Sequence, residues 1–344
     1  MNDDVIIEAS PESIIPNNDL YNCLLNFSGL NKSGCYGISK LYPIFIFLLL
    51  IGINVNYIIF DCNLNPFDIA KAIYYLFFVF FFVYTRFCYN IIKHYKDLIK
   101  IIQCNQREKI VKLISNTSGY LSIFGLSFWI YGTCNMITNN PYFDHNVGDI
   151  FYILFVRLAY LYMYSHIICY IVNICFVFKI HKYQLDGFKK YLQTAKFTKS
   201  EFISNFRKIK NDIRYSENAI GTLLNLGIIS SLFRFPLDMI EIIYDKNYTN
   251  ILVFISNSFC FIFGILVAAK INDYNDCYVT KLYKNVYIRD NKDILEYYIT
   301  FFHNNKIYFR IIKMAPNSTT ISQIFLIIIN VAGSLISGLL SKKK

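Results

Sequence analysis

The sequence predicts an all-α protein, a bundle of seven transmembrane helices with the N-terminus inside the cell, the C-terminus outside and helical extensions in the cytoplasm. Apolar residues make up 55% of the 344 residues and charged residues only 17%, whereas a typical soluble domain has about 25% charged residues. Seven apolar runs follow one another along the chain, each long enough to supply the roughly 20 residues that a helix needs to cross a bilayer. We therefore predict a multi-pass membrane protein.

The positive charges divide the connecting segments into two kinds. The segments after the second, fourth and sixth apolar runs hold 23 Lys and Arg residues, whereas those after the first, third and fifth hold one, Lys246. Because cytoplasmic loops carry the excess of Lys and Arg, this bias predicts a cytoplasmic N-terminus. The net charge of +11 therefore reports orientation, and no basic module interleaved with aromatics indicates a nucleic-acid partner. Residues 342–344 are three lysines at the C-terminus, which this orientation places outside the cell. We accept this exception, because the summed charge bias of all the loops sets the orientation.

The helices are predicted in order along the chain. The first six cover residues 42–60, 69–89, 119–138, 150–180, 219–244 and 251–269. Residues 139–149 carry aspartates and no Lys or Arg, which places that loop outside. The polar first 40 residues lack the positive and apolar regions of a signal peptide. The predicted domains are a cytoplasmic segment 1–40, helices one to six with basic loops 41–270, a cytoplasmic segment 271–316, and helix seven with a short tail 317–344.

The last apolar run, residues 319–340, contains no ionisable side chain. Small or polar residues recur at steps of three and four, which gathers them on one face of a helix. They are Asn330, Gly333, Ser334, Ser337 and Ser341, with Ile336, Leu339 and Leu340 beside them. This face either packs against other helices through small residues or lines a pore with an apolar constriction.

Two further features lie outside the apolar runs. Residues 291–314 alternate charged and apolar positions at roughly helical spacing, which predicts an amphipathic helix docked in the cytoplasm or lying on the membrane surface. The sequon Asn247-Tyr248-Thr249 falls in the predicted outer turn before helix six, so Asn247 is a glycosylation candidate.

Among the ionisable residues inside the predicted helices, the pocket candidates are Arg157 in helix four, and Arg234 with Asp238 in helix five. A charge at this depth is costly, so it normally faces the bundle interior and has a partner. One interpretation is an Arg–Asp link that holds helices four and five together. The other is a ligand pocket whose aromatic walls are Tyr75, Trp129, Tyr131, Tyr152 and Tyr160.

No enzyme motif accompanies these residues. The sequence has no HExxH, no GxSxG and no phosphate-binding glycine loop, and its ten cysteines form no CxxC pair, so neither a metal site nor a cofactor is predicted. We therefore expect no enzyme activity, no cofactor and no metal.

The layout resembles the insect gustatory receptors, a branch of the insect chemoreceptor superfamily. Residues 206–233, FRKIKNDIRYSENAIGTLLNLGIISSLF, are similar to that family's entry into helix five. In helix seven, residues 333–340 read GSLISGLL where the family has a Thr-Tyr, apolar run, Gln-Phe motif, so the chain is identified as a divergent member. The resemblance implies a homo- or hetero-tetrameric, ligand-gated cation channel in the plasma membrane. Four copies of helix seven would surround the pore, with a cytoplasmic anchor before it.

The resemblance also implies a small-molecule tastant as ligand, bound in a pocket that opens outward among helices two to six, with membrane lipid around the bundle and cations passing through the pore. Two other classes remain open. A receptor that signals through a G protein would require the inverted topology. A small-solute transporter would show an internal repeat or a broken midplane helix, and Pro236 in helix five is the one such break in the predicted helices.

Overall fold

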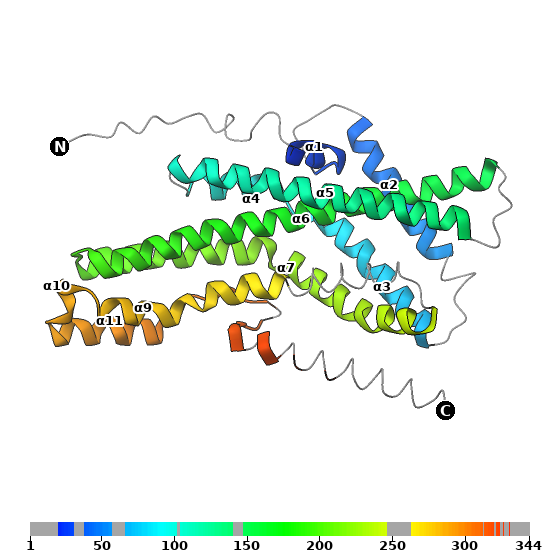
Figure 1. The fold of residues 1–344 in the computed structure, drawn as a ribbon. Helices are drawn as coiled ribbons and strands as arrows, with labels where there is room; N and C mark the ends of the chain where they lie inside the picture. The colour runs from blue at the N-terminus through cyan, green and yellow to red at the C-terminus, as the bar shows by residue number, and fades with distance from the viewer. Residues whose placement is uncertain are drawn as a thin grey trace. The chain divides into compact units, whose positions relative to one another are not determined.

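A computed structural model of the chain contains helices joined by short connections (Figure 1). It describes residues 20–30, 38–56, 66–101, 104–139, 147–245, 263–311, 313–319, 321–323, 326 and 330. Within these residues the only β-type pairing is an isolated bridge between Ile311 and Met314. The all-α fold class is confirmed.

The helices, in order, are α1 (Leu20–Phe27), α2 (Ile38–Asn56), α3 (Pro66–Val83), the π-helical turn η3 (Tyr84–Cys88), α4 (Ile91–Ile99), α5 (Cys104–Asn139), α6 (Val147–Thr194), α7 (Lys199–Asp245), α9 (Tyr274–Leu282), α10 (Val286–Arg289) and α11 (Lys292–Asn304). Residues 263–272 are also helical. They include the end of predicted helix six, whose start lies outside the described residues.

Three predicted helices are longer in the structure. Helix α5 begins at Cys104, α6 ends at Thr194 and α7 begins at Lys199, so most of the two basic segments expected as loops is helical. Lys, Arg and Glu are good helix formers, and buried residues such as Ile110 and Ile114 continue the helical spacing into the charged part. The sequence prediction also missed α1 and α4, because both are too short to register as apolar runs.

The chain divides into two compact units. Unit 1 comprises Met1–Ile51 and Thr85–Phe176, and unit 2 comprises Gly52–Tyr84 and Val177–Lys344. Helix α6 begins in unit 1 and ends in unit 2. Each unit has its own packed interior.

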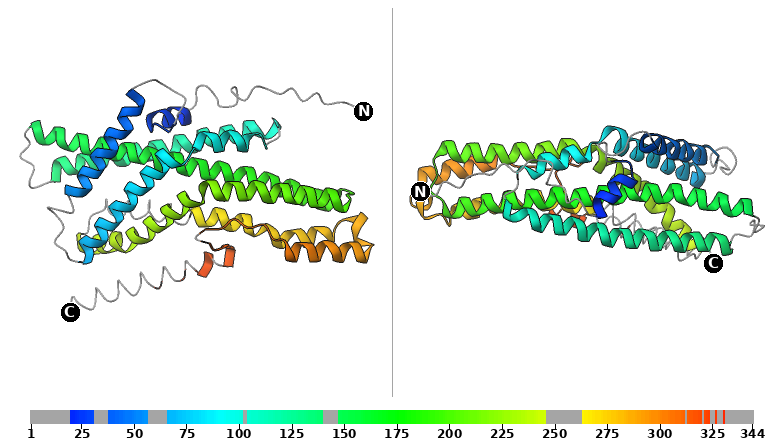
Figure 2. Two further views of the ribbon diagram at one scale, coloured as in Figure 1. Left: turned by 180° about the vertical axis from the view of Figure 1, so that it is seen from behind. Right: turned by 90° about the horizontal axis from the view of Figure 1, so that it is seen from above.

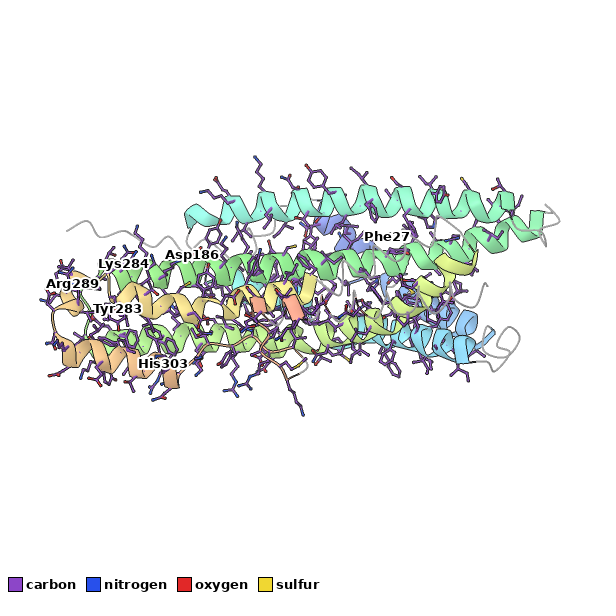
Figure 3. All side chains as sticks on the ribbon, turned by 60° about the horizontal axis from the view of Figure 1, so that its bottom comes forward. Phe27, Asp186, Tyr283, Lys284, Arg289 and His303 are labelled. Carbon is purple, nitrogen blue, oxygen red and sulfur yellow. The ribbon has the colours of Figure 1, made fainter. Side chains whose placement is uncertain are left out.

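In unit 1, the short helix α1 is held against α5 and α6. Tyr162 in α6 donates a hydrogen bond of 2.7 Å from its hydroxyl to the Ser28 carbonyl, just after α1 ends. The Phe27 ring meets the Tyr162 ring edge-on at 5.9 Å; Phe27 is labelled in Figure 3. Helix α1 is therefore part of the fold of unit 1 and not a free polar tail.

Helix α4 follows a π-helical turn and is fixed by a buried polar group. Its N-cap, Asn90, accepts a hydrogen bond from the Lys93 backbone at 3.0 Å. The buried His94 places Nδ1 2.8 Å from the Tyr89 hydroxyl, which also accepts a short hydrogen bond from the Asn173 amide in α6. π-Helical turns insert an extra residue in a helix, and here the helix ends directly after one.

In unit 2, the end of α6 and the start of α7 lie beside α9 and α11, as all views agree (Figures 1 and 2). Their core is a cluster of aromatic rings at centroid distances of 4.5–6.4 Å, made by Phe188, Phe202, Phe206, Tyr278, Tyr298 and Phe302. Polar contacts add a second link, since His181 Nε2 lies 2.8 Å from Ser216 Oγ and Gln184 donates to Asp212 at 2.8 Å. We call this part the cytoplasmic bundle, after the side of the membrane that the charge bias of the sequence predicts for it.

Close approach also joins the helices nearer the predicted membrane region of unit 2. Helix α3 packs along α7. A Cβ placed on Gly264 would lie 2.9 Å from the Leu224 side chain in α7, so glycine permits this contact, as small residues do between membrane helices.

Within the described residues, α6 and α7 each contain a stretch long and apolar enough to span a membrane, and α3 with η3 and α4 would be a third if they form one broken span. Large apolar side chains are also exposed on other helices, for example Phe80 at 60% and Tyr120 at 74%. Exposed apolar surface of this extent is characteristic of a lipid-facing bundle.

Candidate functional site

The segment that joins α11 to the last predicted helix is extended. The sequence predicts an amphipathic helix over residues 291–314. In the structure this stretch is helical only to Asn304. From there Ile307, Phe309 and Ile311 are buried while Tyr308 and Arg310 are exposed. This alternation has the period of two that belongs to extended chain, so the helix prediction was wrong for residues 305–311, 313 and 314.

Two asparagine side chains fasten this extended segment: the buried Asn272, just before α9, and the half-buried Asn275, within α9. The Asn272 amide donates to the carbonyls of Phe309 at 3.1 Å and Pro316 at 2.6 Å, and its oxygen accepts from the Phe309 backbone at 2.7 Å. Asn275 exchanges an equivalent pair with Ile307, at 2.6 and 2.8 Å. Each side chain thus pairs with a backbone group as a neighbouring strand would.

A third side chain holds the start of the following helical turn. The Ser318 backbone donates to Asp273 Oδ1 at 3.2 Å, and the Ser318 hydroxyl donates a short hydrogen bond to Oδ2 of the same carboxylate. A carboxylate at a helix N-terminus satisfies free N–H groups and complements the helix dipole. We call Asn272, Asp273 and Asn275 together the clamp, because they set where the chain leaves the cytoplasmic bundle.

The clamp is tied to the rest of the cytoplasmic bundle by Tyr274, whose hydroxyl donates to Asp186 in α6 at 2.7 Å. Burial, together with the Asp186 carboxylate, raises the pKa of Tyr274 well above its usual value. The phenol therefore stays neutral and donates at any physiological pH.

Sequence reasoning missed the clamp. The period of two over residues 307–311 was the available signal for an extended segment, but a surrounding pattern of charged and apolar residues suited a helix equally well. The local sequence pattern cannot predict which asparagines pair with that segment, because Asn272 and Pro316 are 44 positions apart in the chain.

The predicted pore face lies almost entirely outside the described residues. Asn330 is helical and exposed. Gly333, Ser334, Ser337, Leu340 and Ser341 fall in the part of the chain that the structure leaves undescribed, as does the glycosylation candidate Asn247. These assignments stay predictions.

Of the predicted pocket residues in unit 1, Trp129 and Arg157 lie together. The Trp129 indole donates to the Arg157 carbonyl at 2.7 Å, and the Arg157 guanidinium donates to the Gly132 carbonyl at 3.0 Å. A Cβ on Gly132 would stand 3.1 Å from that guanidinium, so this glycine leaves the room that the arginine occupies. These contacts join α5 to α6.

The other predicted pocket residues of unit 1 are three tyrosines. Tyr131 is 48% exposed. Tyr152 and Tyr160 lie in α6, and their side chains are outside the described residues.

The predicted pocket residues in unit 2 form a second group. Arg234 pairs with Asp238 one turn later in α7, and the Asp238 side chain is completely buried. The guanidinium lies 5.1 Å from the ring centre of Tyr74 in α3, and the Tyr75 ring is 5.7 Å from the Tyr74 ring. This ion pair lies within α7, because i,i+4 side chains share a helix face, and its arginine meets α3. The Arg–Asp link between helices four and five stays a prediction.

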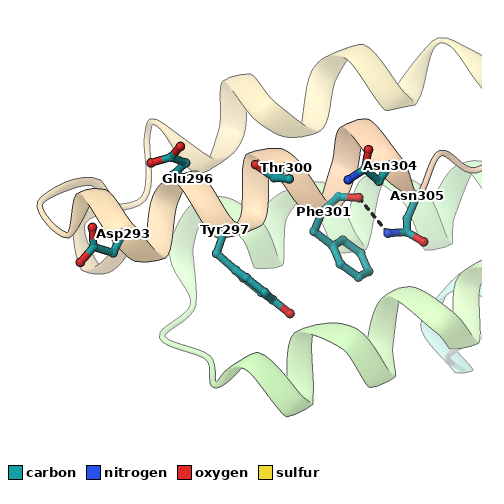
Figure 4. A pocket seen from close by; sticks show the side chains of 7 residues that line it. All are labelled: Asp293, Glu296, Tyr297, Thr300, Phe301, Asn304 and Asn305. Atoms are coloured by element: carbon teal, nitrogen blue, oxygen red, sulfur yellow. Dashed lines mark hydrogen bonds between the residues drawn. The ribbon is translucent and has the colours of Figure 1, made fainter.

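A shallow groove of about 470 Å³ runs along α11 in the cytoplasmic bundle (Figure 4). Its walls come from that helix and the residue after it: Asp293, Glu296, Tyr297, Thr300, Phe301, Asn304 and Asn305. The Lys199 ammonium lies over the Tyr297 ring, 4.4 Å from its centre. None of the predicted ligand-pocket residues lines this groove.

Comparisons with known proteins give a fold relationship. No family model matches the chain, and no curated protein matches it in sequence. Among solved structures, the insect olfactory receptor OR5 from Machilis hrabei has a similar fold, with a TM-score of 0.61 at 11% identity over 92% of this chain and 96% of that one. The chain thus has the fold of that receptor over nearly its whole length.

Proposed function

We propose that the protein is an insect-type chemoreceptor of the gustatory kind, a ligand-gated cation channel of the plasma membrane that assembles as a homo- or hetero-tetramer. The observation that carries this proposal is the similarity to an olfactory receptor over 92% of the chain. A likeness covering both the helical bundle and the cytoplasmic bundle is better explained by a shared architecture than by chance pairing of long helices.

In this proposal the last helix lines the pore. Its stripe of Asn330, Gly333, Ser334, Ser337 and Ser341 would face the axis, with Ile336, Leu339 or Leu340 as an apolar constriction that gates by dewetting. The clamp supports this role, because a pore helix needs a fixed starting point relative to the subunit that holds it. Asp273 and Asn272 hold residues 309, 316 and 318, immediately before that helix.

The ligand in this proposal is a small-molecule tastant bound among the outer halves of helices two to six. The side chains proposed to line its pocket are Tyr75, Trp129, Tyr131, Tyr152, Arg157, Tyr160, Arg234 and Asp238. Arginine and tyrosine offer hydrogen-bond donors beside apolar surface, which is the composition of small-molecule pockets.

The test combines assembly with conduction. Purified full-length protein is expected to be a tetramer by native mass spectrometry, and cells that lack G-protein coupling are expected to give tastant-evoked cation current. Ser337→Leu is expected to reduce or block that current while the tetramer still forms, since the side chain would fill the pore.

Two outcomes would oppose the proposal. A stable monomer without current under a broad tastant panel, with related receptors co-expressed, would contradict the channel. Loss of folding in Ser337→Leu, alongside a normal Ser337→Ala control, would assign the polar stripe to packing within one subunit.

A further inference from the structure

Helix α4 presents a row of lysines on its outer face. Ile91, His94, Tyr95, Leu98 and Ile99 are buried, and the Tyr95 ring stacks on Phe176 of α6 at 4.3 Å. The opposite face exposes Lys93, Lys96 and Lys100, at the three- and four-residue steps of a helix. The packed face fixes α4 on unit 1 and so fixes the direction of the lysines.

Helix α5, joined to α4 by a short connection, has an exposed face that changes chemistry along its length. The face begins with Lys109 and Lys112 and continues through Asn116 to Tyr120 and Ile123. Tyr120 is 74% exposed and Ile123 67%, and Ile130 continues the stripe at 54%. One continuous helix face thus passes from charged to aromatic to aliphatic.

That order matches the order of zones across one side of a bilayer. Aliphatic side chains meet hydrocarbon, Tyr gathers at the interface, and Lys lies at the headgroups. Lys112 and Tyr120 are eight positions apart, roughly 12 Å at 1.5 Å per residue. A lysine reaches back several ångströms toward the interface with its ammonium, which brings Lys112 to headgroup depth.

We propose that the outer lysines of α4 and the first turns of α5 bind the headgroups of anionic phospholipids in the cytoplasmic leaflet. The exposed charges here are Lys93, Lys96, Lys100, Lys109 and Lys112, against the carboxylates of Asp97 and Glu108. Asp97 lies 3.7 Å from Lys100, and five lysines against two carboxylates leave an excess of positive charge. The leaflet follows from the proposed orientation, but headgroup binding itself does not depend on the channel proposal.

The membrane is favoured over a protein or nucleic-acid partner by the continuity of the α5 face. A soluble acidic partner would have to cover the lysines beside an exposed stripe of Tyr120, Ile123 and Phe124 that needs lipid. Anionic lipid supplies both parts at once, hydrocarbon for the stripe and phosphate for the lysines.

The test measures lipid binding to the purified full-length protein in detergent by native mass spectrometry. The probes are short-chain phosphatidylserine and dioctanoyl phosphatidylinositol bisphosphate, with phosphatidylcholine as the neutral reference. The variant is K93Q/K96Q/K112Q, which leaves the Lys100–Asp97 contact in place and keeps a good helix former at each position. The matched control is K196Q/K284Q/K292Q, which removes the same charge from exposed lysines of the cytoplasmic bundle (Lys284 is labelled in Figure 3).

We expect anionic-lipid affinity to fall about fivefold for each lysine replaced and on the order of 100-fold for the triple, with phosphatidylcholine binding unchanged and the control within about twofold of the starting protein. The triple Lys→Arg variant should retain binding, because it retains the charge. Equal affinity in the Gln triple, an equal loss in the control, or equal binding of phosphatidylcholine would overturn the proposal. If the Gln triple does not fold, the three single variants are measured, and no loss in any of them overturns it as well.

Discussion

At the scale of single residues, the buried charges are the most informative feature. Asp238 has a completely buried side chain paired with Arg234, and Arg234 lies over Tyr74. A carboxylate removed from water is tolerated when a guanidinium compensates it, whereas loss of one partner leaves the other charge exposed to a low-dielectric surrounding. The pair is therefore expected to fasten α7 to α3 in addition to any ligand contact.

Replacing one partner tests this directly. Arg234→Leu is expected to destabilise the protein by about 3–5 kcal/mol, because it removes the guanidinium from a buried carboxylate. Asp238→Asn should cost less, since the amide is neutral, and Arg234→Leu with Asp238→Leu should recover part of the loss. The measurements are thermal unfolding in detergent and surface labelling on cells.

The same variants separate structure from ligand binding. A variant that reaches the surface at the normal level but responds differently to ligand would assign the pair to a pocket. Normal expression with an unchanged response in Arg234→Leu would remove both roles.

At the scale of elements, the clamp connects a helix to an extended segment through side chains alone. Asn272 makes three hydrogen bonds to the segment and is 6% exposed. A connection made by a few side-chain-to-backbone hydrogen bonds depends on each of them, whereas a β-sheet is held by many backbone hydrogen bonds. Asn272 thus makes a large share of the contacts by which the clamp sets the geometry of the chain that enters the last helix.

Asn272→Ala is expected to lower the free energy of unfolding by about 2–3 kcal/mol, because the buried Phe309 backbone loses its partners. Since the segment precedes the proposed pore helix, the current of a channel carrying this variant should also change at zero ligand. Unfolding in detergent and patch-clamp recording measure the two effects.

The control for this prediction is Asn304→Ala in α11, where the asparagine is exposed and the change should stay within about 0.5 kcal/mol. Equal stability of the Asn272 and Asn304 variants would mean that the clamp does not hold the segment.

At the scale of the whole molecule, the orientation in the membrane remains a prediction from charge. The proposed inner segments carry 23 Lys and Arg residues against one in the outer segments, a bias large enough to outweigh the three terminal lysines. This orientation is opposite to that of a receptor that couples to a G protein, so it distinguishes the two function classes.

Epitope tags provide the measurement. A tag before Met1 is expected to bind antibody only after the cells are permeabilised, and a tag after Lys344 is expected to bind on intact cells. An N-terminal tag accessible on intact cells would invert the topology and favour G-protein signalling instead.

The sequence by itself determined the helical class and the positions of predicted helices one to five, because long apolar runs and helical spacing are local properties that tertiary contacts rarely reverse. It also located Arg157, Arg234 and Asp238 as charges that need partners, since that requirement follows from burial in an apolar helix.

Only the tertiary structure decided the partners. Arg234 turned out to pair within α7 and to meet Tyr74, Trp129 to bond to the Arg157 carbonyl, and Asn272 to hold a segment 37 and 44 positions away. It also decided that the basic stretches continue α5, α6 and α7 as helix and that the chain after Asn304 is extended. The physical reason is the same in each case. The local sequence pattern predicts that a buried polar side chain has a hydrogen-bond or ion-pair partner. Which group becomes that partner depends on how elements distant in sequence pack together.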